Sequence, residues 1–163
     1  MNLIVAVDSN WGIGCANKLL FHIPDDLKFF KKTTMGKVVV MGHSTFKSLP
    51  GAIPLKGREN IVLSTDTTLS IQGATVVNSV AQLLVALESY SPEEVFIIGG
   101  AQVYALMLEY CNVAYITKIG ASARADTYFP NLDKYPQWEI ENISQPQESN
   151  GIPYKWCKYV KIK

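Results

Sequence analysis

Residues 94–104 read Glu94-Val95-Phe96-Ile97-Ile98-Gly99-Gly100-Ala101-Gln102-Val103-Tyr104. The apolar run that ends at residue 98 predicts a buried strand, the two glycines predict a tight turn, and the residues after them predict a helix to about residue 110. Short β-branched runs alternate with helical patterns along most of the chain. This alternation is typical of strand–helix–strand units around a largely parallel sheet, so we expect an α/β fold.

The same pattern places the remaining elements. Strands are expected at residues 3–7, 37–41, 60–64, 74–77 and 114–119, and helices at 24–34, at 43–48 and from 80 onward after a capping serine. Two last strands, near residues 138–143 and 154–162, have no helix between them, which predicts an antiparallel pair at the sheet edge. Residues 8–23 are predicted to form a long irregular loop, and such loops often act as lids.

The composition indicates one globular domain over residues 1–163. Hydrophobic residues make up 48%, charged residues 18%, and the net charge is +1, so the basic excess of a nucleic-acid-binding protein is missing. No apolar run approaches the roughly 20 residues that span a membrane, and no basic leader precedes the first strand. Three widely spaced cysteines without a CxxC pair favour a reducing compartment, so we expect a cytoplasmic protein. His22 and His43 are too isolated to indicate a metal site.

Two strand-to-helix junctions are candidates for binding phosphate. One is the Gly99-Gly100 turn, and the other is Met41-Gly42-His43-Ser44-Thr45. Glycines let the backbone approach a phosphate closely, and free N–H groups at a helix start face it. Two such junctions suit a ligand with several phosphates. The alternative is that Gly99-Gly100 only makes a tight turn.

Asp26 is the candidate ligand-binding carboxylate. Proline at position 24 suits the first position of a helix, and Asp26 then shares a face of that helix with Phe29 and Phe30. A carboxylate among large apolar side chains is costly unless something pairs with it, and a ligand with a fork of N–H donors does so. The alternative is that the aspartates only favour the positive end of the helix. Arg58 is suited to clamping a ligand carboxylate, or is a plain surface arginine.

Taken in order, the segments resemble the dihydrofolate reductase family over essentially the whole chain. The resemblance is carried by Ile4-Val5-Ala6, the Gly14/Asn17 loop, residues 23–30, 37–42, 57–60 and 96–104, Tyr115-Ile116-Thr117 and residues 126–130. It implies a central, mostly parallel eight-stranded sheet with an antiparallel C-terminal edge, flanked by four helices. It also implies NADPH as hydride donor, 7,8-dihydrofolate as acceptor and tetrahydrofolate as product, in one-carbon metabolism.

The resemblance also assigns roles residue by residue. It implies that Asp26 bonds the pterin, that Thr117 is its hydroxyl partner, bridging through water, and that Phe21 stands beside them in the catalytic group. The implied substrate-binding residues are Ile4, Val5, Ala6, Leu27, Phe30, Leu49, Leu55, Arg58, Ile98 and Tyr104. The implied NADPH-binding residues are Ala6, Ile13, Gly14, Asn17, Leu19, Gly42, His43, Ser44, Thr45, Leu63, Ser64, Thr65, Ile98, Gly99, Gly100, Ala101, Gln102, Val103 and Tyr104. Asp126 is implied to steady the lid loop.

The chain departs from the family pattern at three positions. Phe21 stands where a tryptophan is usual, so the indole N–H that commonly holds a water beside the pterin is lost, and we expect slower proton delivery. His43 replaces a common arginine, which weakens the expected clamp on the 2′-phosphate of NADPH. Ala125 replaces the usual glycine before Asp126, which is expected to stiffen that loop.

Two other functions remain open at the sequence level. One is a related pterin or pyrimidine reductase, such as that of riboflavin synthesis. The other is a non-catalytic folate- or nucleotide-binding protein, because a fold does not guarantee activity. Asp26 and Arg58 together favour a folate, because they suit its two polar ends. We further expect antifolate inhibitors to bind and the chain to be a monomer.

Overall fold

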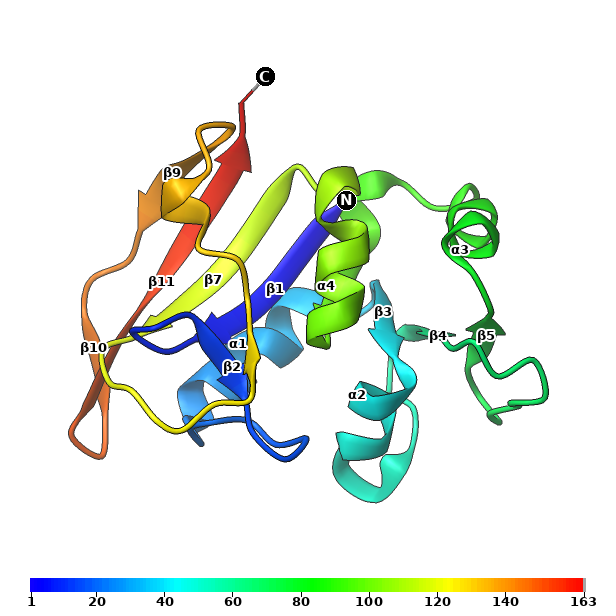
Figure 1. The fold of residues 1–163 in the computed structure, drawn as a ribbon, viewed down its shortest axis with the longest axis horizontal. Coiled ribbons are helices and arrows are strands. Elements are labelled where there is room, and N and C mark those ends of the chain that lie inside the picture. The colour runs from blue at the N-terminus through cyan, green and yellow to red at the C-terminus, as the bar shows by residue number, and fades with distance from the viewer. Residues whose placement is uncertain (163) are drawn as a thin grey trace.

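A computed structural model of the chain describes residues 1–162. Strand β1 (Asn2–Val7) lies at the centre of a twisted sheet, between β7 (Val113–Ile119) and β6 (Val95–Gly99), and runs parallel to both (Figure 1). The parallel half continues through β3 (Val38–Gly42), β4 (Glu59–Leu63) and β5 (Thr75–Val77). Apolar residues 38–41 of β3 are at most 2% exposed, as expected for a central strand covered on both faces.

The other half of the sheet is antiparallel. Strand β11 (Ile152–Lys161) pairs with β7 and, on its far side, with both β9 (Trp138–Ile143) and β10 (Gln147–Ser149). The described part of the sheet has nine strands, but β9 and β10 follow one another along β11 and share one position. The predicted mostly parallel sheet with an antiparallel C-terminal edge is therefore confirmed, with nine described strands in eight positions where eight strands were expected.

Four α-helices flank the sheet, as predicted, within residues 1–162. They are α1 (Pro24–Thr34), α2 (His43–Ser48), α3 (Val80–Leu87) and α4 (Ala101–Met107). The Ser79 hydroxyl accepts a hydrogen bond from the Gln82 amide at 3.0 Å, so the predicted cap of α3 is confirmed. Helix α4 ends earlier than predicted, because residues 108–110 tighten into a 3₁₀ turn. Other 3₁₀ turns are Pro50–Ala52, Pro92–Glu94 and Leu132–Lys134.

The predicted loop at residues 8–23 contains a short strand. Strand β2 (Gly12–Gly14) pairs antiparallel with β8 (Thr127–Tyr128), forming a two-stranded ribbon apart from the main sheet (Figure 1). The sequence analysis missed both strands, because they are very short and glycines carry no strand preference. The ribbon ties the loop before α1 to the loop after β7.

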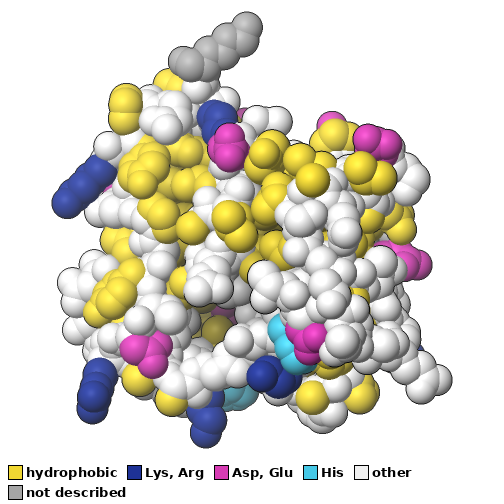
Figure 2. All heavy atoms as spheres, turned by 45° about the vertical axis from the view of Figure 1, so that its right-hand side comes forward, with side chains coloured by type: hydrophobic (Ala, Val, Ile, Leu, Met, Phe, Trp, Pro, Cys, Tyr) yellow, Lys and Arg dark blue, Asp and Glu magenta, His cyan; other side chains and the backbone are white. Residues whose placement is uncertain are grey.

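Apolar and charged side chains are distributed differently on the surface. Figure 2 shows hydrophobic side chains gathered on the upper half of one face, whereas basic side chains are dispersed among acidic and neutral ones. Val85 of α3 and Leu106 of α4 are among the exposed apolar residues, at 65% and 49%. None of the described helices is long and apolar enough to cross a membrane.

Candidate active site

Asp26 lies in the first turn of α1, where the helix packs on the sheet next to β7 and β11. The Thr117 hydroxyl donates to Oδ1 of Asp26 at 2.6 Å, and the Trp156 indole Nε1–H donates to the same oxygen at 2.9 Å. The contact of Thr117 with Asp26 is therefore direct, where a bridge through water was expected. Among residues 1–162, nothing donates a hydrogen bond to Oδ2, so that oxygen is available to a ligand.

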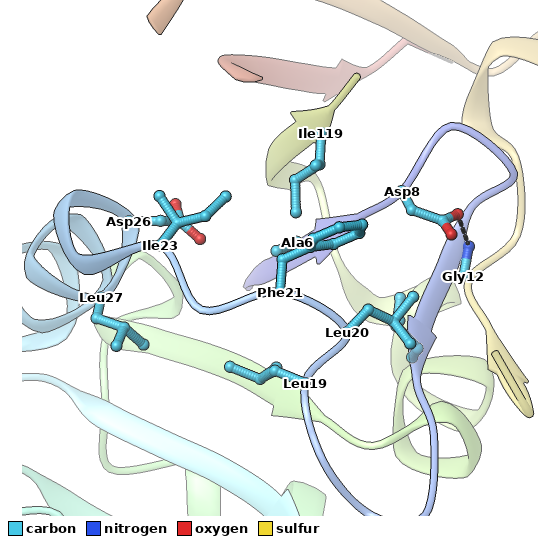
Figure 3. Close-up of a pocket in the computed structure, with 11 residues that line it drawn as sticks. Ala6, Asp8, Gly12, Leu19, Leu20, Phe21, Ile23, Asp26, Leu27 and Ile119 are labelled. Carbon is cyan, nitrogen blue, oxygen red and sulfur yellow. Dashed lines mark hydrogen bonds between the residues drawn. The ribbon is translucent and has the colours of Figure 1, made fainter. Parts of the chain in front are cut away.

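The Asp26 carboxylate opens onto a cleft that Figure 3 shows in close-up. Six predicted site residues line this cleft: Ala6, Ile13, Leu19, Phe21, Asp26 and Leu27. Five more were not predicted: Asp8, Gly12, Leu20, Ile23 and Ile119. Most of the lining is apolar, and in the view of Figure 3 the Phe21 ring lies between Asp26 and Asp8. The cleft thus suits a flat ligand with one polar edge.

Asp8 is the second carboxylate of the cleft, but backbone amides already donate hydrogen bonds to both of its oxygens. Its Oδ1 accepts from the amides of Asn10 at 2.9 Å and Gly12 at 2.8 Å, and its Oδ2 accepts from Ala123 at 3.2 Å. These bonds join the turn before β2 to the loop after β7. Asp8 is therefore a structural staple, and of the two carboxylates Asp26 is the one free to bind a ligand.

The loop from β2 to α1 is held in place over the cleft. The Ala16 amide donates to Oδ2 of Asp126 at 2.9 Å, and the side chain of Asn17 donates to the Ser44 carbonyl at 2.9 Å. The first contact matches the expected role of Asp126, and the second connects the loop to the Gly42–Thr45 junction. Leu19 in the same loop is 64% exposed, which leaves an apolar side chain at the mouth of the cleft.

The two glycine junctions lie against each other. A Cβ on Gly100 would lie 3.2 Å from the Thr45 hydroxyl oxygen, and one on Gly42 would lie 3.1 Å from the Val103 side chain. Gly99 has φ of +117°, and the peptide between the two glycines is cis. A side chain at any of these positions would crowd the space, so the glycines keep the backbone open to close approach. The residues present therefore fit a phosphate-bearing cofactor.

Tyr104 packs against the Gly99-Gly100 junction. Its hydroxyl donates to the Ile4 carbonyl at 2.6 Å, and the ring is 3.1 Å from where a Gly99 Cβ would be. Burial raises the pKa of Tyr104 far above its usual range, so the hydroxyl keeps its proton and remains a donor. Tyr104 thus locks α4 to β1 beside the cleft.

Arg58 lies at the far end of α1 from Asp26. Its Nη1–H donates to the Thr34 hydroxyl at 3.1 Å and its Nε–H donates to the Lys56 carbonyl at 3.1 Å. Burial lowers the pKa of Arg58, but a guanidinium stays charged at neutral pH. Two of its five N–H donors are used, so the rest are free to clamp a carboxylate.

The sequence model of the family described as Dihydrofolate reductase matches residues 1–161. The chain belongs to the dihydrofolate reductase family. It is 37% identical over 163 residues to the dihydrofolate reductase of Bacillus subtilis (strain 168), covering 99% of this chain and 94% of the relative. It is also 37% identical over 161 residues to that of Neisseria gonorrhoeae, covering 98% of this chain and 97% of the relative.

A solved structure of the family has the same fold. It is dihydrofolate reductase from Enterococcus faecalis complexed with NADP(H) and RAB-propyl, at 31% identity and a TM-score of 0.89. The match covers 99% of this chain and 96% of the other. Both the order of strands and the packing of the helices are therefore those of dihydrofolate reductases.

Three further groups of predicted residues have a defined place in this dihydrofolate reductase fold. Leu49, Leu55 and Ile98 pack around Phe46 on the helix α2 side of the sheet. The Ser64 carbonyl accepts from the Asn78 side chain at 2.8 Å, and its hydroxyl accepts from the Asp66 amide at 3.2 Å, close to exposed Thr65. Ile4, Val5 and Val103 are buried in the core.

The structure also places the departures from the family pattern. The Phe21 ring packs against buried Ile23, Ile119 and Tyr154, and as a hydrocarbon it donates no hydrogen bond to the cleft. His43 is the first residue of α2. Ala125 fills the space in front of Gly12.

Trp156 is a hydrogen-bond partner of Asp26 that was not predicted from the sequence. Lysines alternate with aromatic and aliphatic residues in its strand, and that pattern indicates a half-exposed edge. The position of its indole depends on the register between β11 and β7, which no local pattern gives.

Proposed function

We propose that this chain reduces 7,8-dihydrofolate to 5,6,7,8-tetrahydrofolate with NADPH as the hydride donor. The observation that carries the proposal is Asp26 at the edge of an apolar cleft, with Oδ1 held by Thr117 and Trp156 and Oδ2 free. Membership of the dihydrofolate reductase family over residues 1–161 supports it. The chain is thus an NADPH-dependent oxidoreductase of one-carbon metabolism.

The substrate is held at both of its polar ends. Oδ2 of Asp26 accepts from the N–H groups at N3 and the 2-amino group of the pterin, as a paired carboxylate does with a fork of donors. Leu27, Phe30, Leu49 and Leu55 line the path of the ring and benzoyl groups. The free donors of Arg58 bind the α-carboxylate of the glutamate. Such binding at both ends holds the reacting ring in one orientation.

The cofactor site uses the two glycine junctions. Residues 42–45 and 99–104 would hold the pyrophosphate and nicotinamide ribose, and Ser64 and Thr65 would stand near the adenosine 2′-phosphate. When bound, NADPH supplies the hydride that the pterin accepts at C6. The chain contributes a dry, apolar wall on the lid side, through Ile13, Leu19 and Phe21, which keeps water from the reacting faces.

Asp26 orients and polarises the pterin and does not protonate it. It binds the far edge of the ring, so direct proton transfer to N5 is geometrically poor. A water molecule that enters past the lid loop delivers that proton. An ultrahigh-resolution or neutron structure with dihydrofolate bound would contradict this division of roles if it placed an Asp26 oxygen within hydrogen-bond reach of N5.

One spectrophotometric experiment tests the proposal. The purified chain is mixed with dihydrofolate and NADPH, and we expect loss of the nicotinamide absorbance, which an antifolate stops. Activity only with a pterin or pyrimidine lacking the benzoylglutamate tail would indicate a related reductase. Tight binding of dihydrofolate without turnover would indicate a binding protein. The Arg58→Gln variant is the matched control, because it should lose dihydrofolate affinity and retain NADPH affinity.

The oligomeric state and location are part of the same proposal. We propose a cytoplasmic monomer, since the three cysteines are free thiols in the described chain and the cleft is formed by one copy. Cys111 and Cys157 are buried, and burial raises the pKa of each thiol, which keeps them unreactive. Size-exclusion chromatography with light scattering tests the mass, and a dimer that shares the cleft would contradict it.

A further inference from the structure

Trp156 and Thr117 lie opposite each other on two paired strands. They pair directly in the antiparallel register of β11 and β7, and Thr117 pairs in turn with Ala6 of β1. Directly opposed residues of an antiparallel pair project from the same face of the sheet. Both side chains therefore reach the face against which the first turn of α1 packs, and both donate to Oδ1 of Asp26.

The orientation of the Trp156 side chain is fixed by contacts with two aromatic rings and by hydrogen bonds of its backbone. The Phe29 ring of α1 stacks on it with centroids 5.0 Å apart and planes 24° apart, and the Tyr154 ring meets it edge-on at 5.5 Å. The Ser144 hydroxyl accepts from the Trp156 amide at 2.9 Å, and the Ser144 amide donates to the Trp156 carbonyl at 2.8 Å. The ring therefore presents its N–H to Asp26 in one orientation, without reorganising when a ligand arrives.

We propose that Trp156 is a positioning residue for the substrate. With Thr117 it fixes Oδ1 of Asp26, so that Oδ2 faces the cleft and meets the N–H donors of the pterin. Phe21, the aromatic residue on the other side of the carboxylate, has no N–H, so Trp156 supplies the indole donor of this site from β11. The inference rests on the proposed reduction of dihydrofolate.

The Asp26 carboxylate is held by neutral hydrogen-bond donors. The neighbouring Asp25 pairs with Lys28 at 3.9 Å on the exposed side of α1. No cation of residues 1–162 forms an ion pair with Asp26, so the neutral donors alone hold it.

The test compares Trp156→Phe, which keeps a ring for Phe29 to stack on, with Trp138→Phe as the control. We expect Trp156→Phe to raise the KM for dihydrofolate by about tenfold. NADPH affinity should stay unchanged. In the Asp26→Asn background the same substitution should have almost no further effect on KM. Full additivity there would overturn the proposal.

A second measurement needs no substitution of Trp156 and no turnover. The chain has three tryptophans, so its ¹⁵N spectrum contains three indole N–H signals. In Asp26→Asn we expect the Trp156 signal to move while those of Trp11 and Trp138 stay. An unmoved Trp156 signal would overturn the proposal even if Trp156→Phe fails to fold. A moved signal in a chain that does not reduce dihydrofolate would overturn the proposed function and leave the hydrogen bond intact.

Discussion

The Arg58 guanidinium donates to the Thr34 hydroxyl at 3.1 Å, and that hydroxyl in turn donates to the Phe30 carbonyl at 2.8 Å. Thr34 is fully buried at the end of α1, so its position is set by the helix. Thr34 therefore orients Arg58 relative to Asp26, which lies in the first turn of the same helix. One helix fixes the distance between the two polar groups that we propose hold the substrate.

Thr34→Val should weaken the grip on the substrate carboxylate. The change keeps the shape of the side chain and removes one hydrogen bond to a charged donor, so the KM for dihydrofolate should rise about three- to tenfold. Binding of a pterin that lacks the glutamate should not change. Thr34→Ser keeps the hydroxyl and is the matched control. Equal weakening for both ligands would mean that Thr34 acts through the fold and not through Arg58.

Asp26→Asn should distinguish the role of Asp26 in substrate binding from its role in turnover. An amide cannot accept two charge-assisted bonds from the pterin edge, so substrate affinity should fall by about 3 kcal/mol at most. Turnover should become strongly dependent on acid, because a pterin protonated in solution no longer needs the polarising carboxylate. NADPH affinity, measured by fluorescence titration, should stay nearly intact. Loss of NADPH binding in this variant would contradict the separate sites.

Phe21→Trp should speed proton delivery. The larger ring would place an indole N–H in the cleft and hold a water beside the pterin, at the cost of repacking against Ile23 and Ile119. The hydride-transfer rate in single-turnover experiments should rise most at high pH, where protons are scarce. A variant with the same hydride-transfer rate and the same pH profile as the unaltered chain would count against the expected role of this position.

The sequence predicted the main elements because each carries its own pattern. The apolar strands, the proline at the start of α1 and the Ser79 cap are local signals, and the structure confirms them. Asp26 was predictable as a charged residue on an apolar helix face. The β2–β8 ribbon was not, because its strands contain three and two residues and depend on contacts between distant loops.

The hydrogen-bond partners of Asp26 could not be predicted from local sequence patterns alone. The residue pairs Thr117–Asp26 and Trp156–Asp26 are 91 and 130 positions apart in the chain. Thr117 was predicted from the family resemblance, which compares whole chains. Trp156 was predicted neither from local patterns nor from the resemblance, because its position depends on the register of β11 and on the packing of Phe29. Contacts of this kind are set by tertiary structure, and the family pattern supplies them only where the residue is shared.

Ala125→Gly should loosen the lid. A Cβ on Gly12 would lie 2.8 Å from the Cβ of Ala125, so the alanine methyl fills the space in front of β2. Its removal also gives the loop more backbone freedom, and amide exchange at residues 12–18 should become faster while the central strands keep their protection. The opposite change, Gly12→Ala, should destabilise the same ribbon through the clash. Unchanged exchange in Ala125→Gly would mean that the Asp8 and Asp126 bonds alone hold the lid.

The preference for NADPH over NADH should be small, because His43 replaces a common arginine and lacks the fixed charge and the fork of donors with which an arginine clamps a phosphate. Asp66 opposes binding of the 2′-phosphate, because hydrogen bonds from the side chain and amide of Thr68 lower the pKa of Asp66 and keep it ionised at neutral pH. His43→Arg should therefore raise the ratio of kcat/KM for NADPH to that for NADH.

Asp66→Asn should also raise the ratio, because it removes the negative charge near the expected site of the 2′-phosphate. His22→Arg, at the other and exposed histidine, adds a charge outside residues 42–45 and is the control for a general electrostatic effect. Binding of NADPH and NADH should be titrated separately, since a change in affinity for NADPH alone assigns the effect to its phosphate. If His22→Arg and His43→Arg raise the ratio equally, the effect comes from net charge, and the assignment of His43 to the phosphate is wrong.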